Sequence, residues 1–238
     1  MSFSGNENYN KYYGFPSFAY MDMYRNKDLM QLGGCRCKKS YFRVLNGYGD
    51  KPIDVQVNEI LMAENLSIGG LTRYVQFSPG TYRVKIYESE GDKELVFETT
   101  LDIDRNLAYT AVIAKDDENK EDISILVVPE EKENAIKGRM SSLRLTNIAM
   151  NAPDMDVVTA DGTVLFSGIN YANASGNIAV PSGRYTLYLR DSRNKNNLLK
   201  ISNVDLAPRM HYTMFIAEKN DELQLMIPEN GVNYLDIC

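Results

Sequence analysis

Residues 78–87 read SPGTYRVKIY, and residues 180–189 read VPSGRYTLYL. In both stretches a proline lies close to a glycine. This is typical of a turn, because proline fixes its own φ and glycine tolerates φ values that strain other residues. The residues that follow alternate with a period of two. Those expected to face a core are Tyr82, Val84 and Ile86, and then Tyr185, Leu187 and Leu189. Each stretch therefore predicts a turn that leads into a half-buried strand.

Further strands are predicted on both sides of the first turn. The segments with strand character are residues 41–46, 53–57, 73–77, 82–87, 95–101, 108–114 and 123–128. Residues 90–93 and 116–120 are predicted to be hairpin tips. Short strands at this spacing, with no convincing helical segment between them, indicate an all-β sandwich.

The pattern then restarts, which indicates a tandem duplication. Five blocks return in the same order after 99 to 103 residues: RVLN at 43–46 as RLTN at 144–147, PIDV at 52–55 as DMDV at 154–157, GTY at 80–82 as GRY at 183–185, LAYTAVIA at 107–114 as MHYTMFIA at 210–217, and VVPE at 127–130 as MIPE at 226–229. Each unit is large enough to bury its own core. The predicted segments are an arm (1–40), a first sandwich (41–130), a linker (131–140), a second sandwich (141–230) and a tail (231–238).

The composition is close to globular averages, with an acidic balance. Hydrophobic residues make up 44% and charged residues 24% of the 238 residues, and the formal net charge is −6. This sign argues against a general nucleic-acid binder, and no apolar run is long enough to cross a bilayer. Residues 1–40 hold six basic and three acidic side chains, so residues 41–238 carry −9. A basic arm on an acidic body favours attraction between copies.

The cysteines are predicted to link subunits. Cys35 and Cys37 lie among basic residues, which favour the reactive thiolate, and they are too close in sequence to bond each other without strain. The odd count of three indicates intermolecular pairing. A disulfide from either residue to Cys238 of the next copy would build an open polymer; three reduced thiols are the alternative. No zinc site is predicted, because only Cys238 and His211 remain to complete the four ligands and no spacing joins them.

Structural roles are assigned to the other residues that can carry chemistry. His211, the only histidine, aligns with Ala108, so a hydrogen-bonded strand histidine is preferred over a general base. Asp54 and Asp156 recur at matching positions and are expected to bond the backbone of a nearby turn. The other acidic clusters are interpreted as solvated tips rather than calcium sites, since the EF-hand spacing is missing. They are Asp50, Asp102 and Asp104, which could gather with Asp54, and then Asp116, Asp117, Glu118, Glu121 and Asp122.

Tyrosines on the predicted strands are mostly expected in the core. Tyr87 and Tyr188 are expected to point outward, as a contact stripe or a platform for stacking sugars. No catalytic residue, cofactor or metal is predicted.

The same motifs resemble the bacterial family of domain of unknown function 4397. The motifs that carry the resemblance are residues 43–46, 52–57 and 79–84 in the first unit and residues 144–147, 152–157 and 181–187 in the second. The resemblance covers roughly residues 41–230. It implies an immunoglobulin-like or transthyretin-like β-sandwich, often repeated and usually found on bacterial surfaces. It supplies no catalytic residues.

The arm resembles spore coat or spore-appendage proteins, since it is rich in Tyr, Met and Gly and lacks the features of a secretory signal. The resemblance implies synthesis in the cytoplasm and assembly on the spore surface. The leading hypothesis is a self-assembling structural subunit whose arm docks on the next copy, through contacts of Tyr12, Tyr13, Phe15, Phe18 and Tyr20. The alternative is a monomeric β-sandwich module that binds peptide or glycan at a bacterial surface.

Overall fold

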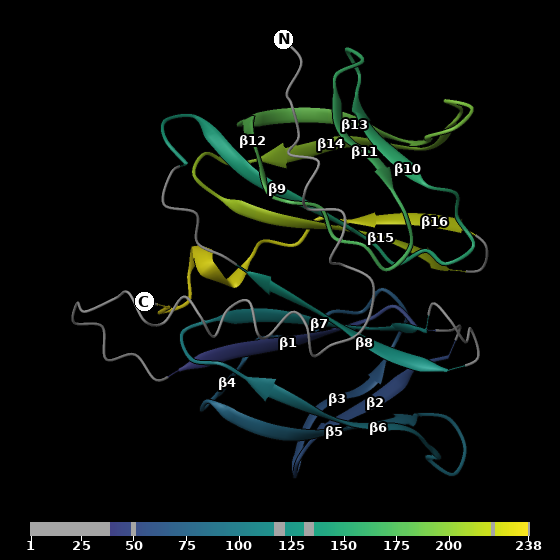
Figure 1. Ribbon diagram of the computed structural model, residues 1–238, viewed down its shortest axis with the longest axis vertical. Coiled ribbons are helices and arrows are strands. Elements are labelled where there is room, and N and C mark those ends of the chain that lie inside the picture. Colours follow the sequence, from purple (N-terminus) through teal and green to yellow (C-terminus); the bar gives the residue numbers. More distant parts are fainter. Residues whose placement is uncertain (1–38, 49–50, 117–121, 131–135, 220–221, 238) are drawn as a thin grey trace.

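Figure 1 shows the protein as a computed structural model, which describes residues 39–48, 51–116, 122–130, 136–219 and 222–237. The strands of the first unit are β1 (Ser40–Asn46), β2 (Ile53–Val57), β3 (Ile60–Leu66), β4 (Val75–Phe77), β5 (Gly80–Glu88), β6 (Leu95–Ile103), β7 (Ala108–Lys115) and β8 (Ile123–Glu130). Those of the second are β9 (Met140–Asn147), β10 (Met155–Thr159), β11 (Val164–Ile169), β12 (Ile178–Pro181), β13 (Gly183–Asp191), β14 (Asn197–Leu206), β15 (His211–Lys219) and β16 (Glu222–Met226). A 3-10 turn, η2 (Gly231–Asn233), follows.

Each unit is a sandwich of two four-stranded sheets. The first unit has the strand orders β4-β1-β7-β8 and β3-β2-β5-β6, and the second repeats them as β12-β9-β15-β16 and β11-β10-β13-β14. Each unit contains one parallel pair, β1 with β7 and β9 with β15. The prediction of an all-β fold with two tandem sandwiches is confirmed.

The two repeated turn-and-strand stretches become β5 and β13, which lie inside their sheets. Gly80 and Gly183 begin these strands with φ values of 156° and 154°, a backbone conformation that side chains disfavour, so the turns require glycine. The predicted alternation is confirmed. Val84 and Ile86 in β5, like the corresponding leucines in β13, are buried.

The sequence did not predict β3, and a bulge explains why. Ile53 pairs with Leu66 and Val55 pairs with Ala63, so two residues of β3 lie opposite Asp54 alone. One of them, Asn65, has a φ of 53°. An extra residue breaks the period of two from which a strand is predicted. The corresponding strand β11 carries the same irregularity, between the partners of Met155 and Val157.

The two units share a hydrophobic cluster in addition to their own cores. Leu45 and Val112 of the first unit belong to this third cluster with Ile148 and Phe215 of the second. The two inner sheets therefore pack face to face, and Figure 1 shows four sheets stacked in one body. As a consequence, β1, β7, β9 and β15 are buried on both faces along most of their length.

The shared cluster makes a testable contribution to stability. Phe215 is fully buried in it, so Phe215→Ala should lower the free energy of unfolding by about 3–5 kcal/mol. The measurement is urea unfolding at equilibrium. Leu198→Ala, at an exposed position of β14, is the control and should change stability by less than about 0.5 kcal/mol. Equal effects of the two variants would contradict a shared core.

Candidate functional site

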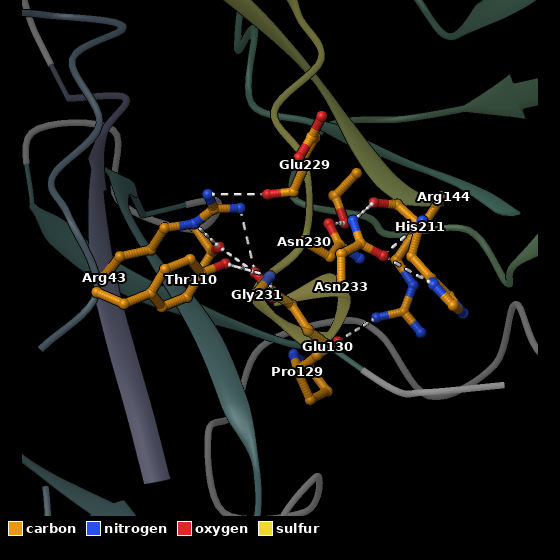
Figure 2. Close-up of polar contacts among 12 residues, drawn as sticks. Arg43, Thr110, Pro129, Glu130, Arg144, His211, Glu229, Asn230, Gly231 and Asn233 are labelled. Carbon is orange, nitrogen blue, oxygen red and sulfur yellow. Dashed lines mark hydrogen bonds and ion pairs between the residues drawn. The ribbon is translucent and has the colours of Figure 1, made fainter. Parts of the chain in front are cut away.

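The predicted cross-linking and docking residues fall outside the described residues. This applies to Cys35, Cys37 and Cys238, and to the arm residues Tyr12, Tyr13, Phe15, Phe18 and Tyr20. Their roles stay predictions. The described residues instead bring together a polar cluster where the two units meet, which Figure 2 shows in detail.

The cluster is centred on a buried ion pair between Arg43 of β1 and Glu130 of β8. Arg43 Nη2 lies 3.1 Å from Glu130 Oε1, and both side chains are almost fully buried. Arg43 Nε donates to Thr110 Oγ1 at 2.8 Å, and Thr110 Oγ1 donates to Glu130 Oε1 at 3.0 Å. The Arg43 guanidinium also lies 4.5 Å from the centre of the Tyr74 ring. Each charge is therefore compensated and hydrogen-bonded, as burial requires.

The second unit completes this cluster. The Gly231 N–H donates to Glu130 Oε2 at 2.5 Å and to Tyr74 Oη at 3.0 Å. The Tyr74 hydroxyl in turn donates to Glu130 Oε1. Burial, followed by the neighbouring charge of Glu130, raises the pKa of Tyr74, which stays a neutral donor. The turn η2 is thus tied to the first unit by hydrogen bonds to the buried Glu130 and the half-buried Tyr74.

The junction, which is the contact between the inner sheets of the two units, has an approximate two-fold symmetry. Arg43 Nη1 donates to the Glu229 carbonyl at 3.2 Å, and Arg144, its counterpart in β9, donates through Nη1 to the Pro129 carbonyl at 2.6 Å (Figure 2). Strand pairing makes these carbonyls equivalent, because Pro129 lies opposite Tyr109 and Glu229 lies opposite Tyr212. Each unit therefore sends the same arginine to the same place on the other unit, as in an isologous dimer interface.

The same register corrects the alignment of the last repeated block. The sequence matched Glu130 with Glu229, but Glu130 corresponds to Asn230 in the structure. Thr110 donates to Glu130, and Thr213, the counterpart of Thr110, donates to Asn230 Oδ1 at 2.9 Å. The alignment of residues 127–130 with residues 226–229 was one residue out of register, because the dipeptide Pro-Glu occurs in both units. Only the first unit, then, has a carboxylate at this position.

His211 is the first residue of β15 and is held by Asn233. Its Nδ1 lies 3.0 Å from Asn233 Oδ1, and its carbonyl accepts a hydrogen bond of 2.9 Å from Asn233 Nδ2 (Figure 2). The prediction of a strand histidine held by hydrogen bonds agrees with these contacts, although Nε2 is buried and has no partner among the described residues. An amide rather than a carboxylate faces the ring, so the contacts are not those of a Ser-His-Asp triad.

Asp54 and Asp156 have the predicted structural role, which is to hold the bulges of β3 and β11. Asp54 Oδ1 accepts a hydrogen bond of 2.8 Å from the Asn65 amide, and Asp156 Oδ1 accepts one of 3.1 Å from the Gly168 amide. A lysine with positive φ reaches each carboxylate from a hairpin tip: Lys93 at 2.8 Å and Lys195 at 3.1 Å.

The other acidic residues do not assemble into a cation site where they are described. Asp102 accepts a hydrogen bond from Thr81 Oγ1 at 2.5 Å, and the Asp116 amide donates to the Asp122 carbonyl at 2.9 Å, next to the β7–β8 tip. Asp50, Asp117, Glu118 and Glu121 lie outside the described residues. Among the side chains that the structure describes, no group of three or more His, Cys, Asp and Glu could hold a metal ion.

The outer sheets offer a different kind of site, because their edge strands carry exposed apolar side chains. The described large hydrophobic residues that are most exposed are Ile60 and Leu61 of β3, Leu95 of β6, Val164 of β11, Leu198 of β14, and Tyr234. All but Tyr234 lie on edge strands of the two outer sheets. An edge strand with apolar side chains is a template for pairing with another chain.

Strand β6 has the longest straight edge of the outer sheets. Its residues pair with β5 without a shift from Phe97 to Ile103, whereas β14 has two shifts and Asn203 at a φ of 61°. Arg83 of β5, the partner of Thr100, directs its own N–H and C=O toward Asn58, at 2.8 and 2.7 Å. In an antiparallel pair, two directly opposite residues point their N–H and C=O groups either toward each other or both outward. Because those of Arg83 point away from β6, the N–H and C=O of Thr100 point away from β5, to the edge that pairs with no other described strand.

Tyr87 and Tyr188 are half-buried on the outer sheets rather than on one common stripe. The Tyr87 hydroxyl lies 3.5 Å from Gln56 Oε1, and the Lys200 ammonium lies 6.0 Å from the centre of the Tyr188 ring. The two rings belong to different sheets at opposite ends of the stack. They do not form a single platform.

Fold and junction together define a duplicated β-sandwich protein whose two halves are fused through their inner sheets. The chain belongs to the family described as domain of unknown function DUF4397, whose model matches residues 40–158 and 141–233. This confirms the family and its tandem arrangement. No curated protein matches the chain significantly. Within the described ranges, no helix is long and apolar enough to span a membrane.

Several solved structures show a limited similarity. The C-terminal domain of AlgF from P. aeruginosa has 16% identity and a TM-score of 0.32, over 39% of this chain and 99% of that chain. The family CBM26 module CBMbc of Eubacterium rectale Amy13K has 8% identity and a TM-score of 0.26, over 80% and 97%. The Bacillus anthracis TIE protein has 10% identity and a TM-score of 0.22, over 76% and 33%. Scores this low do not bear on the function.

Removal of the buried carboxylate should destabilise the protein strongly. Glu130→Gln leaves the Arg43 charge buried without a counter-ion, which should lower the free energy of unfolding by about 3–5 kcal/mol in urea titrations. The double variant Arg43→Met/Glu130→Gln should recover part of this loss, because it also removes the stranded charge. Asp205→Asn breaks the exposed pair with Arg184 and should leave stability unchanged. A double variant less stable than Glu130→Gln would refute this account.

The bulge aspartates should contribute a dependence of stability on pH. Burial alone would raise the pKa of Asp54, but hydrogen bonds from Asn65, Lys93 and Ser89 outweigh it and lower the pKa below 3.8. The pKa of Asp156 is lowered in the same way. Unfolded aspartates take up protons near pH 4, while the folded ones stay ionised. Their contribution to the free energy of unfolding is therefore complete above about pH 4, and it is lost as the pH falls through the pKa of the folded state.

Asp54→Asn/Asp156→Asn should accordingly unfold with a flatter acid dependence than the wild type, measured as urea midpoints from neutral pH downward. Lys93→Met/Lys195→Met removes only one donor from each aspartate and should give an intermediate slope. If the double asparagine variant kept the wild-type slope, the aspartates would not be the source.

Proposed function

We propose that the protein is a binding module that captures an extended peptide as an added strand along β6. The observation that supports this is the straight edge of β6, which pairs with no further strand among the described residues. The junction buries the facing sides of the inner sheets, whereas the outer sheets and their edges remain accessible to a partner. Strand addition supplies affinity through main-chain hydrogen bonds and selectivity through alternate side chains. This proposal takes up the monomeric-module hypothesis and chooses peptide over glycan.

The side chains along β6 indicate what the peptide should contain. Glu98, Thr100 and Asp102 share the outer face of the strand, and Phe97 and Leu101 share the inner face. Arg83 Nε lies 3.3 Å from Glu98 on the side away from the edge. A basic residue on an added strand would approach the acidic row from the open side. We therefore expect a peptide that alternates Lys or Arg with apolar residues.

The same row disfavours a second copy as the partner at this edge. In an antiparallel β6–β6 pair centred on Thr100, Glu98 of one copy would lie opposite Asp102 of the other. Like charges directly opposite each other are destabilising. Self-assembly through the arm and through disulfides of Cys35 or Cys37 with Cys238, on a spore surface, remains a separate prediction about residues outside the described ranges.

The test is fluorescence anisotropy with a labelled ten-residue peptide that alternates Lys and Val. Wild-type protein should bind it, and should bind the matching Glu–Val peptide much more weakly. Thr100→Pro removes an N–H that points to the open edge and should weaken binding about tenfold, while Thr100→Val keeps that N–H and should bind like wild type.

Glu98→Lys/Asp102→Lys should reverse the preference toward the Glu–Val peptide, which keeps the test decisive if Thr100→Pro misfolds. Equal binding by the Pro and Val variants, or no binding of either peptide, would overturn the proposal. Sedimentation that showed a wild-type dimer lost in Thr100→Pro would assign the edge to a second copy instead.

A further inference from the structure

The outer sheet of the second unit, at one end of the stack in Figure 1, carries a row of side chains that crosses all four of its strands. The Tyr188 row, read from β11 through β10 and β13 to β14, consists of Val164, Val158, Tyr188 and Lys200. Directly opposite residues share one face of a sheet. The leucines on either side of Tyr188 belong to the core of the sandwich, so alternation places the Tyr188 row on the outer face.

The corresponding row of the first unit has a different chemistry. Its members are Leu61, Gln56, Lys85 and Glu98. Its lysine is paired, because Lys85 Nζ lies 4.0 Å from Glu98 Oε2. In the Tyr188 row, Lys200 Nζ instead lies 6.0 Å from the centre of the Tyr188 ring and has no ion pair among the described residues. The duplication has therefore replaced a polar row by an apolar and aromatic one that ends in an uncompensated charge.

The Tyr188 row is accessible to a partner at several points. Val164 is 47% exposed, Lys200 is exposed and Tyr188 is half-buried. The Tyr188 hydroxyl makes no hydrogen bond to any described residue. A tyrosine with an exposed ring and an unpaired hydroxyl offers an apolar surface and a polar group side by side, which is why tyrosines are frequent where ligands bind.

The charges around the row favour an anion. Arg190 and Lys195 both reach the carboxylate of Asp156, at 3.0 and 3.1 Å, so that two cations share one counter-ion. Asp156 and Arg190 lie opposite each other, two residues from Val158 and Tyr188, and thus on the same face. Lys200 adds a further positive charge. This excess is local, since the whole chain carries −6, and it complements an anionic ligand.

We propose that the Tyr188 row binds a short oligosaccharide of acidic sugars. The row crosses paired strands, so a peptide would find few free main-chain groups there, in contrast to an edge. The four strands span roughly 14 Å, room for several sugar rings in line. The CH groups of a sugar ring pack on Tyr188 and Val164, and a sugar carboxylate pairs with Lys200. This goes beyond the peptide-binding proposal and is independent of it, because β6 belongs to the other unit.

The test is an NMR titration with trigalacturonate, a chain of three acidic sugars. The ring signals of Tyr188, assigned by their loss in Tyr188→Ala, should shift saturably, whereas those of Tyr87 in the first unit should not. The trimethyl ester of the same sugar carries no charge and should bind severalfold more weakly, because it cannot pair with Lys200. Added sodium chloride should weaken the binding of the acid and leave that of the ester unchanged.

Matched variants separate this site from the rest of the surface. Tyr188→Lys/Lys200→Glu gives the row the residues of the first unit and should abolish binding of trigalacturonate, while its binding of the Lys–Val peptide stays that of the wild type. Lys85→Ala, at the corresponding place in the first unit, should bind trigalacturonate like the wild type.

The proposal fails if the wild type gives no saturable shift of Tyr188, if the ester binds as tightly as the acid, or if Tyr188→Lys/Lys200→Glu still binds. A wild-type dimer in sedimentation that this double variant dissociates would assign the face to a second copy, which would also overturn the proposal.

Discussion

The central strands of the inner sheets, β1, β7, β9 and β15, are buried on both faces, and this constraint organises the molecule. One row of their side chains enters the sandwich to which the strand belongs, and the other row enters the junction between the two units. Burying a face that contains Arg43 and Glu130 is costly unless these charged groups find partners. The ion pair, the threonine and the carbonyls of the opposite unit supply those partners. The way in which the two units meet is therefore determined by polar groups as well as by apolar packing.

A tandem duplication allows the two halves of such an interface to diverge. In a homodimer, each substitution would appear on both sides of the axis. In one chain, Glu130 can remain while its counterpart is Asn230, and Ala108 can face the core of the junction while its counterpart is His211. The strand framework is therefore nearly symmetric, whereas the polar groups that the two units bring to the junction differ. The first unit holds a closed ion pair, and the second holds a buried arginine whose Nε–H has no partner among the described residues.

The outer sheets differ in the same way. Strand β6 of the first unit is straight along most of its length, and β14 of the second is interrupted by bulges. Bulges make an edge unsuitable for further pairing. One copy of the duplicated strand is therefore protected, and the other is open. The two units are alike in their cores and different at the surfaces where partners can bind.

The sequence by itself determined the strands in which polar and apolar residues alternate, such as β5 and β13, and it determined the duplication. It also indicated the role of Asp54 and Asp156, because both the residue and its position recur. It did not indicate β3, since a bulge breaks the period of two in that strand. The junction was decided only by the tertiary structure. Alternation shows that a strand has two faces but not what the second face meets, and the groups that meet there are distant in sequence: Arg43 contacts Glu130, 87 residues away, and Glu229, 186 residues away.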